Sequence, residues 1–329
     1  ARRLPSAVSS TDFTQQLPAS QANALIGQLR NVWSPTSRTG APNAGFGMTL
    51  GGNLPTGGTG VSYLLSGTYS FSQETRAGSR RALAQVSGAG TAEELDRYDG
   101  DLGRNSVLWG GIANLSTTIG SRSKVALNNT YNRTMDNEGR LETGRSENLS
   151  QDLQIQRLRY VERNVRSTQL ALTHDIGRGQ QIEWGVTASG VTRREPDRSE
   201  IVYSLPEGGG APQWFGFSNE AAVRTFADLK ENSLEANVNW RLSLGAASVG
   251  RSLKVGGLYR TTDRDAVNTS YSLSLARALG AADLGGPDAD RKVDAVIAGF
   301  TADAGMPTLP AMMPDIDRCF SAESVAEIE

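Results

Sequence analysis

The sequence is short of the residues from which many catalytic and metal sites are built. Its 329 residues include one cysteine, Cys319, and one histidine, His174. One cysteine excludes an intramolecular disulfide and a zinc site built from several cysteines. One histidine excludes a metal site with several histidine ligands. The chain therefore offers little for disulfide, zinc-finger or multi-histidine chemistry.

The chain also lacks an excess of charge and a long apolar run. Lys+Arg (33) and Asp+Glu (35) give a formal net charge of −2, so electrostatics give no reason to expect a nucleic-acid partner. The longest comparable apolar stretch, 295–300, is far shorter than the roughly 18 residues of a membrane helix. Hydrophobic residues make up 38% of the chain, below the usual range of about 45–50%. Composition alone describes a polar soluble protein, but the order of the residues indicates another class.

What the sequence does have is a period of two in its hydrophobic residues. In the segment 61–72, one set of alternate positions carries valine, tyrosine, leucine and phenylalanine, and the other carries mainly serine and threonine. A strand presents alternate residues on opposite faces, whereas a helix would scatter both sets around its circumference. The same alternation predicts about eight strands, over 44–51, 60–74, 105–119, 123–136, 150–175, 181–205, 221–242 and 252–264.

The connections between these predicted strands alternate in length. Short, turn-rich connections fall at 53–59, 120–123, 176–180 and 243–251, and long polar ones fall at 75–104, 137–149, 206–220 and after 265. An up-and-down transmembrane barrel has this alternation, because one rim carries short periplasmic turns and the other carries longer extracellular loops. We therefore predict an all-β, antiparallel up-and-down transmembrane β-barrel segment.

The apolar residues and the aromatic rings lie at regular distances along the chain from the short turns. Each apolar face lies within about a dozen residues of a short turn, which fits a membrane strand of about 9–11 residues. Two groups of rings lie at different distances from those turns: Tyr63, Trp184 and Trp240 are nearer, and Tyr69, Phe71, Trp109, Tyr131 and Tyr259 are farther. Aromatic girdles of membrane barrels have this arrangement. We expect the apolar faces to contact lipid and their Ser/Thr/Asn counterparts to face a watery interior.

Several segments resemble the early barrel strands of TonB-dependent outer-membrane receptors. They are GMTLGGNLP (47–55), YLLSGTYSFS (63–72), WGGIANLS (109–116) and LNNTYNR (127–133), with PDRSEIVY (196–203) and YRTTDRDA (259–266) similar again. The likeness covers about residues 40–270. It implies a barrel of about 22 strands, closed around an N-terminal plug domain, that imports a scarce ligand with energy passed from the inner membrane.

This resemblance also sets the expected location and partners. It implies the outer membrane of a Gram-negative-type bacterium, with outer-membrane lipid, the TonB energy-coupling system and a small ligand as partners, no cofactor and no nucleic acid. The ligand class stays open among siderophore, metal complex, glycan and peptide. Because neither a plug domain with its energy-coupling box nor the closing strands occur in the sequence, we expect the chain to be a fragment of the barrel.

The sequence divides into three parts. Residues 1–43 form an irregular lead-in from an extracellular loop or hairpin region, with a short helix predicted over 19–31. Residues 44–265 carry the barrel strands. Residues 266–329 form a tail, with a helical pattern near 288–300 and a proline-rich coil at 307–314, whose relation to the barrel is open.

Few residues suggest chemistry, and each has a simpler interpretation. His174 and Asp175 could form a base and its orienting carboxylate, but their place beside a turn favours a solvated rim. The loop Asp99–Asn105 carries oxygen ligands at alternate positions, as in a calcium loop, but Gly110 stands where that motif needs a glutamate. The glycine-rich segment Gly57–Gly60 lacks the lysine and helix of a phosphate loop, which favours a hairpin turn.

Two charged segments could contribute to a ligand surface. They are the run Arg193–Glu200 and an acidic cluster of Glu93, Glu94, Asp96, Asp99 and Asp101, and both favour solvated extracellular faces. We interpret Cys319 as incidental. We expect no enzyme, assign no catalytic, cofactor-binding or metal residue, and leave the ligand-binding residues open.

Two other functions remain as alternatives. The first is a small closed barrel of eight strands with a structural or adhesive role. The second is a soluble all-β binding module, which predicts that the faces bearing Trp109, Trp184 and Trp240 are buried against a second sheet.

Overall fold

The protein is one large antiparallel sheet with two short helices at its N-terminal side. The computed structural model describes residues 2–13, 17–37, 39–56, 59–86, 92–147, 149–216, 218, 220–244 and 251–273. Its elements are α1 (Ser6–Ser9), α2 (Ala19–Ile26), β1 (Ala44–Thr56), β2 (Thr59–Val86), β3 (Ala92–Ile119), β4 (Ser123–Ser146), β5 (Gln151–Gly177), β6 (Gln180–Ser204), β7 (Gln213–Trp214), β8 (Ala222–Leu244) and β9 (Arg251–Leu273).

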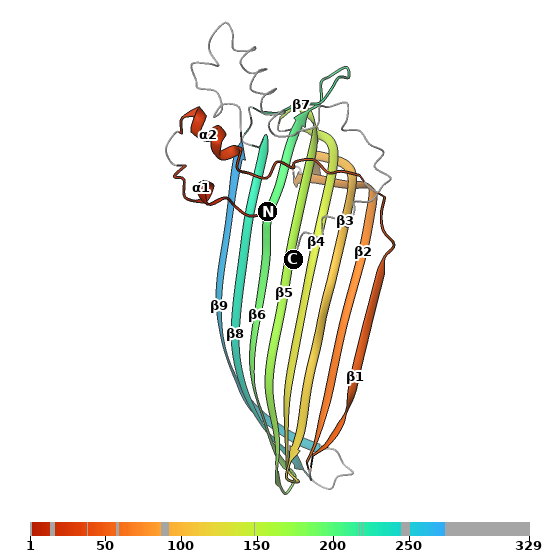
Figure 1. Ribbon diagram of the computed structural model, residues 1–329, viewed down its shortest axis with the longest axis vertical. Helices are drawn as coiled ribbons and strands as arrows, with labels where there is room; N and C mark the ends of the chain where they lie inside the picture. Colours follow the sequence, from red (N-terminus) through yellow and green to blue (C-terminus); the bar gives the residue numbers. More distant parts are fainter. Residues whose placement is uncertain are drawn as a thin grey trace.

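The strands follow one another across the sheet in chain order. The order is β1-β2-β3-β4-β5-β6-β8-β9, with the two-residue β7 beside β6, and every pairing is antiparallel. Figure 1 shows the strands running along the long axis, with β1 and β9 at opposite edges. In the described part of the chain these edge strands do not pair with each other. The prediction of an all-β, antiparallel up-and-down sheet is confirmed.

Several strands are longer than the sequence predicts. The polar segments 75–104 and 137–149 are not long loops, because β2, β3 and β4 extend through most of them. The alternation of hydrophobic residues ends in these segments. The strands remain paired there, and oppositely charged side chains of neighbouring strands contact each other. Arg80 pairs with Asp99 at 2.8 Å, and Arg104 pairs with Glu138 at 2.7 Å. The predicted alternation of short and long connections is therefore wrong at 75–104 and 137–149.

The two ends of the described chain also differ from the prediction. Helix α2 stops at Ile26, five residues before the predicted end, with Gly27 as its C-cap. Strand β9 continues past 265 to Leu273, so the tail begins as strand. The segments 288–300 and 307–314 and Cys319 lie outside the described residues.

Side-chain packing is concentrated at one end of the sheet. We call the end at which β1 meets β2, β3 meets β4, β5 meets β6 and β8 meets β9 the lower end, and the opposite one the upper end. Buried clusters lie toward the upper end, where the N-terminal segment 2–37 crosses in front of the strands (Figure 1). The lower half is a single layer in the described residues, so its side chains have no second sheet to pack on.

Candidate functional site

The strand register sorts the lower half of the sheet into two unlike faces. Residues that lie directly opposite each other in antiparallel strands point to the same face. One such row crosses β2 to β9 as Tyr63, Leu115, Leu127, Leu170, Val186, Ala236 and Tyr259. We call the face with this row the apolar face.

The row next to it lies on the opposite, polar face. From β3 to β9 it consists of Asn114, Asn128, Gln169, Thr187, Glu235 and Arg260, and its member in β2 is Leu64. These side chains bond along the row: Asn128 donates to Gln169 at 3.1 Å, Gln169 donates to Thr187 at 3.3 Å, and Arg260 Nε donates to Glu235 at 2.8 Å. A one-residue shift along the chain thus exchanges hydrocarbon for a hydrogen-bonded polar stripe.

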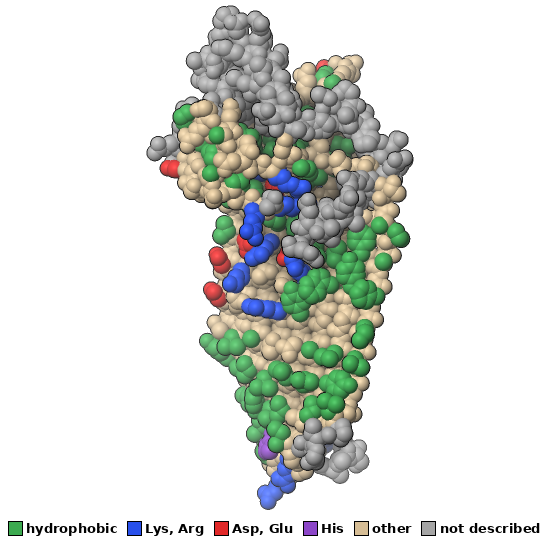
Figure 2. Space-filling model, in the orientation of Figure 1, with side chains coloured by type: hydrophobic (Ala, Val, Ile, Leu, Met, Phe, Trp, Pro, Cys, Tyr) green, Lys and Arg blue, Asp and Glu red, His purple; other side chains and the backbone are tan. Residues whose placement is uncertain are grey.

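The apolar face is exposed in the lower half. Leu170 is 39% exposed, Val238 52% and Tyr259 71%. Other large exposed apolar side chains on this face are Phe46, Met48, Leu50, Leu54, Leu65, Leu115, Val186, Leu234, Leu253 and Val255. Figure 2 shows hydrophobic side chains spread over the lower half and charged ones gathered above them. The protein therefore presents an apolar band bordered by charge.

The tryptophans of this face do not pack on another layer. Trp109 is 38% exposed, and Trp184 and Trp240 are half-buried. The soluble-module alternative predicts a second sheet over these rings. Within the described ranges the strands form one sheet, so that burial is not found.

The polar face changes character in the upper half, where it carries a network of ion pairs. Three carboxylates there, Glu138, Glu142 and Glu195, have side chains that are at most 8% exposed. Each is held by at least two guanidinium groups: Arg104 and Arg140 at Glu138, Arg81 and Arg140 at Glu142, and Arg159, Arg193 and Arg198 at Glu195. Buried charges need such partners, because an unpaired one is costly to desolvate.

An ion pair on the other face, at the upper end, fastens the N-terminal segment. Arg224 Nη1 donates to both carboxylate oxygens of Asp197 at 2.7 Å, and the two side chains are 1% and 3% exposed. The same guanidinium donates to the backbone carbonyl oxygen of Val32 at 2.8 Å and lies 4.1 Å from the ring centre of Trp33. Burial lowers the pKa of Arg224, and the Asp197 carboxylate opposes that shift.

Trp33 completes this clamp with apolar contacts. It packs in a cluster with Ile201, Tyr203, Ala222 and Leu273, from three strands. Residues 2–13 reach the same face, where the Arg2 guanidinium lies 4.6 Å from the ring centre of Tyr160. The lead-in is thus docked on the sheet at two places.

Tyr203 in this cluster gives a pH-dependent prediction. Burial raises its pKa from 10.0 to about 12. Between these values the unfolded chain releases the phenolic proton while the folded one retains it, so stability falls as pH rises through this window. We expect Tyr203→Phe to remove roughly 2–3 kcal/mol of that loss. Urea titrations of both proteins between about pH 9 and about pH 12 measure it, and parallel profiles would contradict it.

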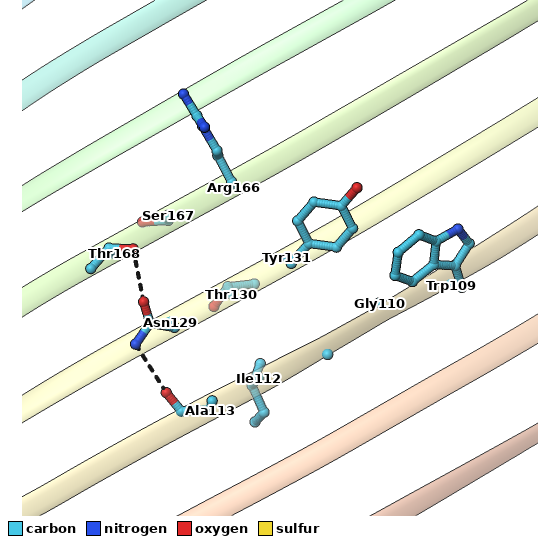
Figure 3. A pocket seen from close by; sticks show the side chains of 11 residues that line it. Trp109, Gly110, Ile112, Ala113, Asn129, Thr130, Tyr131, Arg166, Ser167 and Thr168 are labelled. Atoms are coloured by element: carbon cyan, nitrogen blue, oxygen red, sulfur yellow. Dashed lines mark hydrogen bonds between the residues drawn. The ribbon is translucent and has the colours of Figure 1, made fainter.

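Two hollows lie on the apolar face near the border between the apolar band and the charged side chains, and Figure 3 shows the first of them. Each is open to the outside and has a volume of about 460 Å³. The first is lined by Trp109, Gly111, Ala113, Asn129, Tyr131, Arg166 and Thr168, among others. The second continues from Arg166 and Thr168 to Ala188, Asn232 and Asp263. Arg166 lines both, and its guanidinium lies on the side of the second, where it donates to the amide oxygen of Asn232 at 3.4 Å.

The aromatic and polar groups of the first hollow are held in place. The ring centres of Trp109 and Tyr131 are 5.0 Å apart. Thr168 donates to the amide oxygen of Asn129 at 2.8 Å, and the Asn129 amide donates to the Ala113 carbonyl at 3.4 Å. In Figure 3, Trp109, Tyr131 and Arg166 stand out from three neighbouring strands. The hollow has an aromatic wall and a polar wall, and the Arg166 guanidinium points away from both, toward β6 (Figure 3).

The sequence candidates take simple structural roles. His174 Nδ1 lies 2.7 Å from the hydroxyl of Ser123, and the Asp175 carboxylate accepts from the Gly177 amide at 2.7 Å, so Asp175 does not orient the imidazole. Beside Gly57–Gly60, Thr56 pairs with Thr59, as in a hairpin, and residues 57 and 58 lie outside the described ranges. Asp99–Asn105 is not a loop but part of β3.

The acidic cluster is also part of β3. The hydrogen bond from Arg80 lowers the pKa of Asp99, and Asp101 accepts from the Gly78 amide at 2.9 Å. The Asp96 carboxylate accepts from the Glu147 amide at 3.2 Å, and the side chains of Glu93 and Glu94 lie outside the description. Asp99 and Asp101 thus link β3 to β2.

The prediction that 193–200 is a solvated run is wrong for Glu195 and Asp197, which are 3% and 6% exposed. A bulge between Glu195 and Arg198 turns these two carboxylates to opposite faces, where arginines from other strands bind them. Sequence reasoning also missed Arg224 and Arg166. Neither belongs to a periodic pattern. Their contacts come from residues that the strand register brings beside them.

Comparison with known proteins gives no relative. No family model, no curated protein and no solved structure matches this chain. In the described residues, no helix has the length and apolar character needed to cross a membrane. The same residues contain no group of three or more His, Cys, Asp or Glu side chains placed to hold a metal ion.

Proposed function

We propose that this chain is part of a transmembrane β-barrel of an outer membrane. The observation that carries the proposal is the exposed row from Tyr63 to Tyr259, backed across the sheet by a hydrogen-bonded polar row. Soluble monomers rarely expose contiguous apolar patches larger than a few hundred Å². A barrel strand in lipid needs apolar side chains on its outward face alone, and its inward face can remain wet.

Within that class we propose a receptor of the TonB-dependent type, taking part in energy-coupled import of a scarce ligand. The resemblance of the strands supports this choice. The polar face supports it too, because its upper half carries the Arg/Glu network that would line an entrance for a polar ligand. In this proposal β1 and β9 pair with further strands of a larger barrel, since an open edge in hydrocarbon leaves costly unpaired backbone groups.

Lipid quenching tests the membrane part. The protein is placed in phosphatidylcholine bilayers whose acyl chains carry bromine, and its tryptophan fluorescence is compared with that in unbrominated bilayers. We expect quenching of Trp184 and Trp240 as well as Trp109, which is 38% exposed on the same face, so a Trp184→Phe/Trp240→Phe variant should lose the share of the first two. A protein that remains in solution and is not quenched would favour the soluble binding module instead.

The coding sequence on either side of this segment tests the receptor part. A plug domain upstream and further amphipathic strands downstream are the expected finding. An eight-stranded protein without either would favour the small closed barrel with a structural or adhesive role.

A further inference from the structure

Arginines outnumber carboxylates in the ion-pair network on the upper half of the polar face. The three buried glutamates of this network share the guanidinium groups of six arginines, which are Arg81, Arg104, Arg140, Arg159, Arg193 and Arg198. Neighbouring ion pairs on the same face are one to one: Arg76–Glu74, Arg157–Glu200 and Arg163–Asp136. The network therefore has an excess of three positive charges.

The carboxylates of the network lie beneath its guanidinium groups. The side chains of Glu138, Glu142 and Glu195 are at most 8% exposed. Those of the arginines are more open, with 41% for Arg81 and 40% for Arg198. A guanidinium has five N–H donors, which is more than one carboxylate oxygen can accept. A ligand that approaches this face therefore meets arginine before glutamate.

The strand register also places like charges directly opposite each other. Arg140 of β4 lies opposite Arg157 of β5, and Arg163 of β5 lies opposite Arg193 of β6. Like charges that face each other across an antiparallel pair of strands are destabilising. An anion between the two guanidinium groups removes this repulsion, so these two pairs are the places where an anionic group is bound most favourably.

The arginines of β5 continue this arrangement along the strand. Arg157, Arg159 and Arg163 point to the polar face, and the first and last are about 20 Å apart at 3.3 Å per residue. Arg157 and Arg159 are about 7 Å apart by the same rise. A ligand with two or more acid groups can contact several of these arginines at once, whereas an anion with one acid group cannot.

We propose that the ligand of the polar face is an anion with two or more carboxylate or phosphate groups. The arginines that bind it are the two facing pairs and the row on β5, namely Arg140, Arg157, Arg159, Arg163 and Arg193. Their planar guanidinium groups match carboxylate and phosphate oxygens bidentately. This inference rests on the proposed receptor function and deepens it, because it gives the imported ligand a charge and a set of binding residues.

Isothermal titration calorimetry with citrate and with pyrophosphate tests the proposal. The protein is placed in phosphatidylcholine bilayers at constant ionic strength, and acetate serves as the anion with one acid group. We expect at least one of the two probes to bind at least about tenfold more tightly than acetate, because hydrogen bonds to further charged groups are added.

The variant Arg157→Gln/Arg159→Gln removes two arginines of the β5 row. It should weaken binding of the probe at least about tenfold, since charge-assisted hydrogen bonds are lost. The buried Glu195 keeps Arg193 and Arg198 as partners in this variant. The matched control is Arg260→Gln, which removes an arginine of the same face that pairs with Glu235 in the lower half and should leave the affinity unchanged.

Glu200→Gln gives an opposite result that unfolding cannot imitate. Glu200 neutralises Arg157, so its replacement leaves that guanidinium to the ligand. We expect the affinity for the probe to rise about threefold, the size of one surface ion pair. Binding of neither probe, equal affinity for acetate, an equal loss in Arg260→Gln, or no gain in Glu200→Gln would each overturn the anion site.

Failure of this inference is separable from failure of the proposed function. If brominated bilayers quench the tryptophans but neither probe binds, the anionic ligand class alone is wrong. If the tryptophans are not quenched but a probe binds with the expected dependence on Arg157, Arg159 and Glu200, the membrane receptor is wrong and the polar face is the anion site of a soluble module.

Discussion

Replacing Asp197 with leucine is expected to lower the free energy of unfolding by about 3–5 kcal/mol, because it leaves the Arg224 guanidinium buried without its counter-charge. Arg224 is 1% exposed, and its other partners are backbone carbonyls of the lead-in and the Trp33 ring. Urea titration followed by tryptophan fluorescence measures the change. Limited proteolysis should also cut the segment 2–37 faster.

Two further variants show whether the charge is responsible. The double variant Asp197→Leu/Arg224→Met replaces the pair with apolar side chains and should recover most of the loss, as buried ion pairs exchanged for well-packed hydrocarbon often do. Asp228→Asn breaks the pair with Arg194, whose side chains are 61% and 56% exposed, and should cost less than about 1 kcal/mol. Equal losses for Asp197→Leu and Asp228→Asn would contradict a buried pair.

Replacing Leu170 with arginine is expected to destabilise the protein in a bilayer by about 2–4 kcal/mol, since it places a cation on the face proposed to meet hydrocarbon. Leu170 is 39% exposed and lies among Leu127 and Val186 in the apolar row. The measurement is the free energy of unfolding in phosphatidylcholine bilayers by urea titration.

Its control is the adjacent residue on the same strand. Gln169 points to the polar face, where it bonds to Asn128 and Thr187, so Gln169→Arg keeps the new charge in a wet environment. We expect its effect to be below about 1 kcal/mol. If both arginine variants cost equally little, the two faces are both in water and the membrane proposal is wrong.

The sequence predicts the lower half of the sheet closely. Alternation alone predicts the strands over 123–136, 150–175 and 181–205, and the structure has β4, β5 and β6 there with the same faces. Alternation is sufficient because a strand sends successive side chains to opposite faces whatever its neighbours are. The upper parts of β2, β3 and β4 carry charged residues on both faces, so the same signal fails there.

The candidate site was not predictable in the same way. Each hollow beside Arg166 needs residues from three or more strands, and Gly190 lies 24 positions from Arg166 in the chain although it is its register partner. The burial of Glu195 and Asp197 likewise follows from a bulge and from arginines far away in sequence. No local pattern marks such contacts.

The sequence by itself determined that the sheet has one apolar and one polar face, because a period of two is a local property of the chain. The tertiary structure alone decided which charges are buried and where the lead-in docks. These features depend on register, which sets the partners of each side chain across the sheet and is fixed by all the strands together.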